Sequence, residues 1–379
     1  MSRKVKIKTN TIGFSKILKV VTQDVEKDER PFCCFLLQQH HKCQVEPEGY
    51  ACIATDDEVY FNNSKQTVIL LSKDDFSDIQ ENDVIGIEDK HSTLNYFYRV
   101  GSNSNALFVT ECCNSHCLMC PQPPKLENSV ELEDLHRIIT KLPKDLKEIC
   151  VTGGEPTLLG NDLIDLLQML ARNCPECHVH MLTNGKKFRE KDFAGDCLNT
   201  GLKSISFGIP LYSSVDTLHN YIVQDNDAFK DTLEGIYNLA RLGASIEIRV
   251  VLTKINALRL RELADFIYRN MTFVNHIALM GMEHMGYVKL NWDKVYINPA
   301  TYQEELVSAV RYLRLRGMNV SIYNLPLCIL DPRLWSFSRK SISDFKQGYD
   351  ARCCDCSVIA DCGGLFERQK EAMCIKPIK

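Results

Sequence analysis

The stretch most able to do chemistry is ECCNSHCLMC, at residues 111–120, which holds four cysteines. Cys113, Cys117 and Cys120 form C-x3-C-x2-C directly after the apolar run ALFVT. A loop in that place can bring three thiolates to one point, and three ligands leave one position of a four-coordinate metal or cluster open. Spacing alone leaves two alternatives, a zinc knuckle or unrelated buried cysteines. Cys112 could replace Cys113 only by changing the spacing, so we expect it to bind nothing.

Composition narrows the class of protein. The 379 residues are 45% apolar, carry a formal charge of −4 and include 18 cysteines. This charge does not favour nucleic acid or an anionic membrane as partner, because both need a concentrated basic surface. No run approaches the roughly 18 apolar residues of a membrane span, and the basic start lacks the apolar stretch of a signal peptide. We therefore expect a cytoplasmic protein, in which a surplus of cysteines indicates metal binding or catalysis rather than disulfides.

The distribution of apolar and polar residues divides the chain into three regions. Residues 1–102 are expected to form a β-rich domain, from the stretches KVKIKT, EVYFNN, TVILLS and DVIGIED. Residues 103–323 alternate apolar strand-like runs with amphipathic stretches of helical length, which predicts a parallel sheet with right-handed crossovers and a full or partial barrel. Residues 324–379 lose this periodicity. In a barrel of this kind the loops after the strands carry the active site.

The expected elements of the barrel region can be stated by residue. Strands are predicted at NALFVT, EICVT, HVHMLTN, SISFGI, IEIRVVL, HIALMG and NVSIY. Helices are predicted at 130–142, 161–172, 187–198, 226–242, 258–269 and 301–316.

The cysteine spacing after the first barrel strand resembles the signature of radical S-adenosylmethionine (SAM) enzymes. The resemblance implies a partial (β/α)6 barrel, a catalytic [4Fe-4S] cluster on Cys113, Cys117 and Cys120, and SAM bound at the fourth iron. It also implies reductive cleavage of SAM to methionine and a 5′-deoxyadenosyl radical, which abstracts hydrogen from substrate. The residue before the last cysteine is often aromatic in this superfamily and packs near the adenine. Here it is Met119, which could still pack against a ring.

The superfamily also expects a glycine-rich segment after the second strand, to contact the amino group of SAM. EICVT runs into GGEP, residues Gly153, Gly154, Glu155 and Pro156. Glycines let a backbone approach a ligand closely. Glu155 offers a carboxylate to an ammonium group, and Pro156 stiffens the turn.

Weaker matches occur on the later strands. The resemblance implies that Asn184 in LTNG, Ser206 in SISFG and Arg249 in IEIRVV bind the ribose or the methionine carboxylate. A buried arginine needs a partner, and a carboxylate suits it. The alternative for Arg249 is a structural ion pair, for example with Glu247.

A second group of cysteines lies near the C-terminus and resembles a shortened auxiliary-cluster segment of some radical SAM enzymes. Four thiolates would close the shell of a second [4Fe-4S] cluster, which suits electron transfer or structure. A metal could also replace a core in this region. A zinc site with the same ligands is the alternative, and Cys354 could replace Cys353, or Cys374 replace Cys328. The predicted ligands are Cys328, Cys353, Cys356 and Cys362.

The whole layout resembles the radical SAM maturases of His-Xaa-Ser peptide systems, on TECCNSHCLMCPQPPK, GGEPTLLG, SISFGI, EIRVVLTK, YNLPLC, SISDF and the terminal C-x2-C-x5-C-G-G-x-F. The resemblance implies post-translational maturation of a ribosomally made peptide or protein, a second radical SAM protein as partner, and a flavodoxin or ferredoxin as electron donor. Two other functions remain open: a radical SAM enzyme for a small molecule or nucleotide, and a non-catalytic iron–sulfur sensor.

Overall fold

The computed structural model describes residues 4–37, 48–88, 91–340, 347–366 and 375–379. Contacts between Cα atoms divide the chain into two compact units. One comprises residues 1–108, 130–149 and 169–177, and the other comprises 109–129, 150–168 and 178–379. The boundaries expected at 102/103 and 323/324 stay predictions. Among the described residues, none of the helices has the length and apolar character needed to cross a bilayer.

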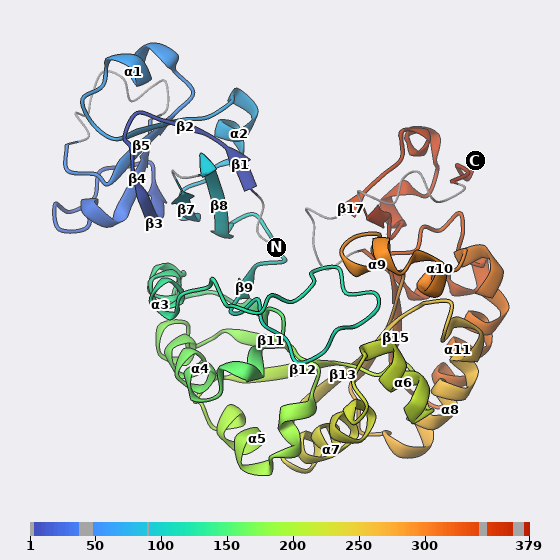
Figure 1. The fold of residues 1–379 in the computed structure, drawn as a ribbon. Helices are drawn as coiled ribbons and strands as arrows, with labels where there is room; N and C mark the ends of the chain where they lie inside the picture. Colours follow the sequence, from blue (N-terminus) through green and yellow to red (C-terminus); the bar gives the residue numbers. More distant parts are fainter. Residues whose placement is uncertain (1–3, 38–47, 89–90, 341–346, 367–374) are drawn as a thin grey trace. The chain divides into compact units, whose positions relative to one another are not determined.

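The N-terminal region forms an eight-stranded mixed sheet in the order β1-β8-β7-β3-β4-β5-β6-β2 (Figure 1). Only Ile7 separates β1 from β2 in sequence, yet β1 pairs with β8 and β2 pairs with β6. The chain at residues 4–9 therefore closes the sheet on itself. The strands are β1 (Lys4–Lys6), β2 (Lys8–Thr9), β3 (Ser15–Val21), β4 (Cys33–Leu36), β5 (Cys52–Thr55), β6 (Val68–Leu70), β7 (Val84–Glu88) and β8 (Thr93–Tyr98).

Apolar side chains fill the closed sheet. Leu18, Val20, Ile85 and Leu94 belong to one buried cluster to which nearly every strand contributes. Phe35 points to the opposite face of β4, because side chains alternate along a strand, and it belongs to a second cluster. Both faces of the central strands are thus covered, which explains why their sequences are continuously apolar.

One expected strand is wrong. EVYFNN forms helix α1 (Glu58–Asn63), and a second short helix, α2 (Lys73–Asp78), follows. The Asp57 carboxylate accepts the backbone N–H groups of Val59 and Tyr60 at 2.9 and 3.3 Å. This side-chain cap satisfies donors that a new helix leaves unpaired, and it outweighs the alternating pattern of the stretch.

The second sheet confirms the predicted partial barrel. Its order, β16-β15-β14-β13-β12-β11-β10-β9, follows the sequence step by step, and its described end strands do not pair with each other. The pairs from β11 to β16 are parallel. All seven expected strands are present and a short eighth follows. They are β9 (Ala106–Phe108), β10 (Glu148–Thr152), β11 (His178–Leu182), β12 (Ser204–Pro210), β13 (Ser245–Val251), β14 (His276–Met280), β15 (Val320–Tyr323) and β16 (Ser338–Arg339).

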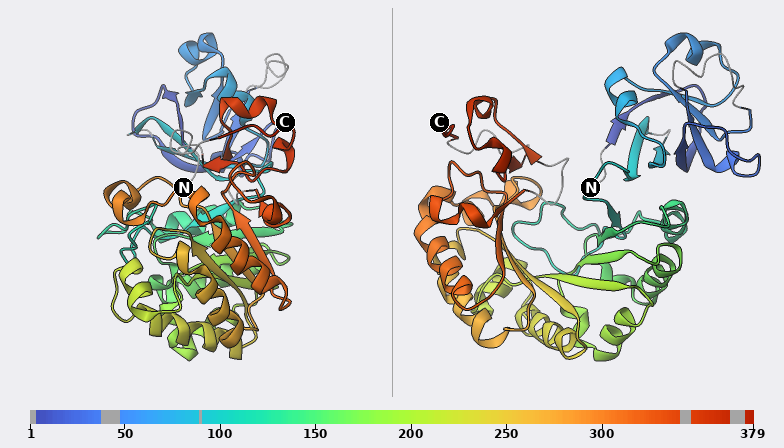
Figure 2. Two further views of the ribbon diagram at one scale, coloured as in Figure 1. Left: turned by 90° about the vertical axis from the view of Figure 1, so that its right-hand side faces the viewer. Right: turned by 180° about the vertical axis from the view of Figure 1, so that it is seen from behind.

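Helices cover the outer face of this sheet (Figure 2). The six expected helices are present, and α6, α9 and α10 are additional. Their bounds are α3 (Leu132–Lys141), α4 (Asn161–Asn173), α5 (Lys191–Leu198), α6 (Asp216–Val223), α7 (Ala228–Arg241), α8 (Leu260–Asn270), α9 (Tyr287–Leu290), α10 (Trp292–Val295) and α11 (Gln303–Arg314).

The C-terminal region has little regular structure, as its sequence predicts. A two-stranded antiparallel pair joins β17 (Gln347–Gly348) to β18 (Leu365–Phe366). The described residues of this region also form three short 3₁₀ helices: Pro332–Phe337, Ala351–Asp355 and Ile359–Asp361.

Two helical glycines provide a matched test of the packing outside the barrel sheet. A Cβ atom on Gly235 of α7 would lie 2.1 Å from the carbonyl oxygen of Gly185, whereas a Cβ on Gly195 of α5 meets nothing within 4 Å. Alanine is the better helix former by about 1 kcal/mol, but overpacking costs about 1–3 kcal/mol. We expect Gly235→Ala to lower the melting temperature and Gly195→Ala to leave it unchanged or raise it. Equal melting temperatures for the two variants would contradict this packing.

Candidate active site

The cysteine loop follows β9 and is held on one side by the end of α6. The backbone N–H groups of His116 and Leu118 donate to the carbonyl oxygens of Val223 and Ile222 at 3.1 and 2.9 Å. These bonds fix the chain on both sides of Cys117. The helix that makes them was not expected from the sequence.

The loop after β14 holds the other side. The Tyr287 N–H donates to the carbonyl oxygen of Cys120 at 2.9 Å, and the Asn291 side-chain amide donates to that of Leu118 at 3.1 Å. Gly286 has a φ of +60°, and a Cβ there would lie 2.3 Å from the Cys120 oxygen. Only glycine allows both this conformation and this approach.

The three thiols share one site. Burial raises the pKa of Cys117 above its ordinary range, and the thiols of Cys120 and Cys113 raise it further. Burial also raises the pKa of Cys113 to about 11, with added contributions from Glu155 and Cys120. The three sulfurs are therefore near enough for each to influence the ionisation of its neighbours. A bound cation would favour the thiolates instead, because metal ligation deprotonates cysteine.

The donor set suits an iron–sulfur cluster. Within the described residues, no three His, Cys, Asp or Glu side chains converge closely enough to bind a single metal ion. A tetrahedral zinc would need sulfurs about 3.8 Å apart, because each lies about 2.3 Å from the metal. A [4Fe-4S] cluster binds each thiolate through a different iron, so it accommodates more widely spaced sulfurs. Three soft sulfur donors in one loop fit that group.

Glu155 joins the ends of β10 and β11. Its side chain is almost completely buried. One carboxylate oxygen accepts the N–H and hydroxyl of Thr157 at 3.0 and 2.6 Å and the hydroxyl of Thr183 at 2.7 Å; the other accepts the Asn184 N–H at 2.6 Å. Pro156 opens a 3₁₀ helix that this carboxylate caps. The amino group of SAM, if it bound Glu155, would therefore compete with four hydrogen-bond donors that the carboxylate already accepts.

The two glycines of GGEP lie against the cysteine loop. The N–H groups of Gly154 and Glu155 donate to the carbonyl oxygens of Thr110 and Cys112 at 2.7 and 2.8 Å. A Cβ on Gly153 would lie 2.5 Å from the Thr110 oxygen, and one on Gly154 would lie 2.2 Å from the Cys112 oxygen. The close approach that the sequence predicted is thus made here to protein backbone.

Asn184 and Lys186 hold the middle of the cysteine loop. The Asn184 amide donates to the Asn114 side-chain oxygen at 2.7 Å, and the Lys186 ammonium donates to the Asn114 carbonyl at 2.8 Å. Lys186 is buried and pairs with Asp225. Sequence reasoning missed Lys186, although it follows directly after LTNG.

Ser206 lies on the polar inner face of the barrel. Its hydroxyl is 2.9 Å from Nε2 of His178 and 2.8 Å from Nδ1 of His180, both on β11. It faces these imidazoles from the first half of β12, so a ribose would have to compete with them. Its role in cofactor binding stays a prediction.

Arg249 forms the ion pair that was the alternative for it. Its Nη1 donates to Glu247 Oε1 at 2.6 Å, and His276 Nδ1 lies 2.6 Å from Glu247 Oε2. Burial of Glu247 opposes ionisation, but the His276 hydrogen bond and the Arg249 charge lower its pKa to about 2. The other guanidinium donors make no hydrogen bond to the described residues, so Arg249 can still serve a ligand.

Met119 is buried in an apolar cluster that backs the cysteine loop. Its partners in this cluster include Tyr212, which follows β12 and which the sequence analysis did not single out. The Tyr212 ring stacks on the buried His219, with ring centres 5.7 Å apart and planes at 26°. Next to Met119, the structure thus supplies an aromatic ring from another strand.

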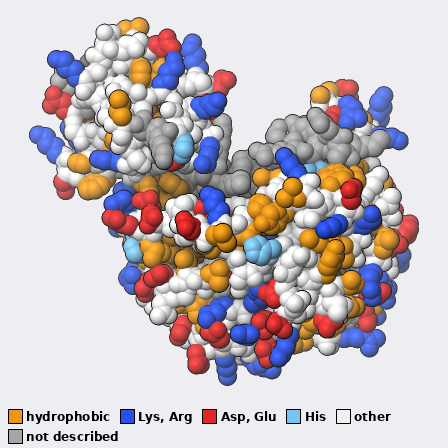
Figure 3. Space-filling model, viewed as in Figure 1, with side chains coloured by type: hydrophobic (Ala, Val, Ile, Leu, Met, Phe, Trp, Pro, Cys, Tyr) orange, Lys and Arg blue, Asp and Glu red, His pale blue; other side chains and the backbone are white. Residues whose placement is uncertain are grey.

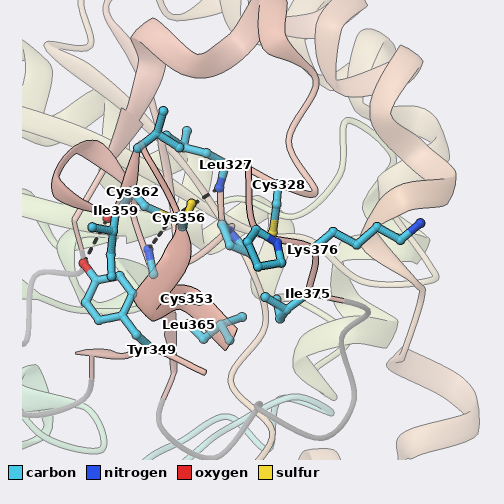
Figure 4. Close-up of a pocket in the computed structure, with 14 residues that line it drawn as sticks. Leu327, Cys328, Tyr349, Cys353, Cys356, Ile359, Cys362, Leu365, Ile375 and Lys376 are labelled. Atoms are coloured by element: carbon cyan, nitrogen blue, oxygen red, sulfur yellow. Dashed lines mark hydrogen bonds between the residues drawn. The ribbon is translucent and has the colours of Figure 1, made fainter. Parts of the chain in front are cut away.

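The four cysteines predicted as an auxiliary set come together (Figure 4). They line one pocket of about 370 Å³, part of it open to solvent. The N–H groups of Leu327 and Gly364 each donate to Cys362 Sγ at 3.4 Å. Cys354 is exposed and does not line the pocket, and Cys374 lies outside the described residues. The lining cysteines are Cys328, Cys353, Cys356 and Cys362.

Comparison with known proteins agrees with this geometry. The family model described as "Radical SAM superfamily" matches residues 107–267. The match covers less than half of the chain, and over these residues the chain is similar to radical SAM proteins. A match to that superfamily implies a [4Fe-4S] cluster and SAM as cofactors.

Similar proteins include two curated GTP 3′,8-cyclases. That of Campylobacter jejuni strain NCTC 11168 is 30% identical over 213 residues, which are 52% of this chain and 63% of the relative. That of Helicobacter pylori strain 26695 is 28% identical over 183 residues, 46% of this chain and 55% of the relative. The chain thus spans less than two thirds of the length of these relatives. SuiB from Streptococcus suis, solved bound to S-adenosylmethionine, has a TM-score of 0.43 and 16% identity over 57% of this chain and 46% of that one.

The buried histidine beside the cysteine loop predicts acid sensitivity. Burial lowers the pKa of His219 from 6.5 to about 4. The unfolded chain therefore binds an extra proton below pH 6.5, and stability falls as the pH drops from about 6.5 towards 4; linkage gives roughly 2 kcal/mol at pH 5. His219→Asn keeps an acceptor for the Tyr212 N–H but does not titrate. We expect a shallower loss of melting temperature between pH 7 and 5 in this variant; an unchanged slope would show that His219 does not contribute.

Proposed function

We propose that this protein cleaves SAM reductively at a [4Fe-4S] cluster held by Cys113, Cys117 and Cys120, and abstracts hydrogen from a ribosomally made peptide or protein. The bound cluster and SAM would supply an electron and a 5′-deoxyadenosyl radical. The observation that carries the proposal is the shared site of three thiols at the carboxyl end of the first barrel strand. That end of a barrel is where active sites lie.

The chain's own residues would position the reaction. Asn184 and Lys186 hold the cysteine loop through Asn114, which would restrain the backbone that carries the thiols. Arg249, oriented by Glu247, would present its remaining donors to the carboxylate of SAM. The apolar cluster around Met119 would exclude water from the same place.

We propose a second [4Fe-4S] cluster at the auxiliary cysteines. Two N–H groups directed at Cys362 support it, because such bonds stabilise a thiolate and tune a cluster. Four protein ligands would close its shell, so electron transfer or structure is the role we assign. A zinc ion on the same four residues is the alternative.

We infer the class of substrate from the charged side chains near the proposed catalytic site. Near the three thiols, Lys186 pairs with Asp225 and Arg249 pairs with Glu247. A triphosphate would need several free cations. These surroundings favour a weakly charged substrate, and the resemblance to His-Xaa-Ser maturases suggests a peptide with such repeats.

A nucleotide is the second candidate substrate, because the relatives with about 30% identity are named GTP 3′,8-cyclase. A non-catalytic iron–sulfur sensor is a third possibility. For the peptide reaction we propose a cytoplasmic setting, with a flavodoxin or ferredoxin as electron donor and a second radical SAM protein as partner.

One pair of assays separates these functions. Reconstituted protein is incubated without oxygen with SAM and reductant, together with either a His-Xaa-Ser-rich peptide or GTP. We expect 5′-deoxyadenosine and a mass change in the peptide, with GTP unchanged. Conversion of GTP alone would establish the second candidate, and bound iron without 5′-deoxyadenosine would indicate a sensor.

Cysteine variants test the division between the two sites. Cys117→Ala should abolish SAM cleavage, because two thiolates cannot hold the catalytic cluster, whereas Cys112→Ala should leave it intact. Cys356→Ala should retain some cleavage but impair substrate conversion, with Cys354→Ala as its control. The measurements are iron content, 5′-deoxyadenosine and product. Complete loss of cleavage in Cys356→Ala with iron retained at the first site would contradict separate roles.

A further inference from the structure

The outer face of the barrel carries a groove between α8 and α11, two helices that pack side by side (Figure 1). The groove has a volume of about 780 Å³, part of it open to solvent. Four arginines line it: Arg261 of α8, Arg311 of α11, Arg316 just beyond α11, and Arg333 of the 3₁₀ helix Pro332–Phe337.

Two of these arginines are stacked on one buried ring. The guanidinium carbons of Arg261 and Arg316 lie 3.8 and 3.4 Å from the centre of the Tyr312 ring. Groups this close cannot share one face of a ring, so they lie on its opposite faces. The Tyr312 hydroxyl donates to Asp265, which holds the ring in place. Stacking engages the faces of the guanidinium groups and leaves N–H donors at their edges for an anionic acceptor.

The positive charge of this groove is not compensated. Within the described residues, Arg261, Arg311 and Arg316 form no ion pair. The carboxylates nearby have other partners, in the pairs Glu262–Arg259, Asp265–Arg269 and Glu304–Arg333. On the face of the barrel drawn in Figure 3, by contrast, acidic and basic side chains are interspersed. The chain as a whole has a formal charge of −4, so this groove departs from its average charge.

Helix stability does not account for the whole cluster. The helix dipole favours cations at a C-terminal end, which would explain Arg311 and Arg316. Arg261, however, is the second residue of α8, where the dipole opposes a cation. A cation that is placed against the dipole and has no carboxylate partner indicates a role in binding an anion.

The shape of the groove and one exposed apolar side chain favour a protein as that anion. Leu315 lines the same groove and is 78% exposed. Small-molecule sites enclose most of their ligand, whereas the three guanidinium groups lie exposed along an open groove. Protein interfaces commonly combine arginine and aromatic residues with an apolar centre and a polar rim. An acidic protein surface with an apolar side chain among its carboxylates would be complementary.

The groove also reaches the segment that carries an auxiliary cysteine. Arg333 follows Cys328 of the auxiliary pocket by five positions. We propose that the arginine groove of α8 and α11 docks a small electron-carrier protein with an acidic surface. This assignment rests on the proposed function, which requires an electron donor. In the docked complex the carrier loses one electron and this protein gains one, and no bond forms or breaks.

The test measures the Kd of an acidic flavodoxin for the full-length, cluster-reconstituted protein by calorimetry at low salt. Arg311→Glu should raise this Kd about tenfold, because it places like charges across the interface. The matched control is Arg314→Glu, since Arg314 is exposed on the same helix but does not line the groove. Its Kd should change less than about twofold. SAM cleavage driven by reduced flavodoxin should weaken in Arg311→Glu, whereas cleavage driven by dithionite should not.

Several results would overturn this docking face. They are an unchanged Kd in Arg311→Glu, an equal rise in Arg314→Glu, and weakened binding of the substrate peptide in place of flavodoxin. Saturable binding of pyrophosphate that Arg311→Glu abolishes, with flavodoxin affinity unchanged, would instead assign the groove to a small anion. Absence of SAM cleavage by dithionite-reduced wild-type protein would reject the proposed function, while the Kd values would still decide the docking face.

Discussion

The thiol site depends on one buried carboxylate. Glu155 accepts four hydrogen bonds from Thr157, Thr183 and Asn184, while its own N–H donates to the loop that carries the cysteines. A charge with so little exposure is tolerated only when its oxygens are satisfied. The ends of two strands and the cysteine loop are therefore locked together, and three thiols can be held close in a segment that has no regular secondary structure.

Polar and charged side chains inside the barrel are also paired with one another. Glu247 pairs with Arg249 and His276, and the Ser206 hydroxyl lies within hydrogen-bond distance of His178 and His180. Burial lowers the pKa of His180 to about 4, with Glu247 opposing this effect. The charges of Glu247 and Arg249 thus offset each other, and the remaining guanidinium donors of Arg249 make no hydrogen bond to the described residues.

Sequence periodicity predicted the barrel well, because each strand carries an apolar face that a covering helix must bury. Cysteine and glycine spacing likewise located residues that the fold brings together, as at Cys353 and Cys356. Residues that reach the site only because distant segments of the chain pack together could not be identified from the spacing of residues in the sequence. Neither Tyr212 nor Lys186 belongs to a spaced motif, and their positions follow from β12 and β11 as packed elements. The strand expected at EVYFNN is wrong because the Asp57 side chain caps a helix at this position.

The closure of the N-terminal sheet limits how that region could recognise another chain. Peptides often bind by adding a strand to an exposed sheet edge. The two end strands of the described sheet, β1 and β2, have only three and two residues and pair with β8 and β6, so the edges left for such an addition are short. Recognition of a partner by this region would then depend more on side chains of its outer surface and connecting loops than on main-chain pairing.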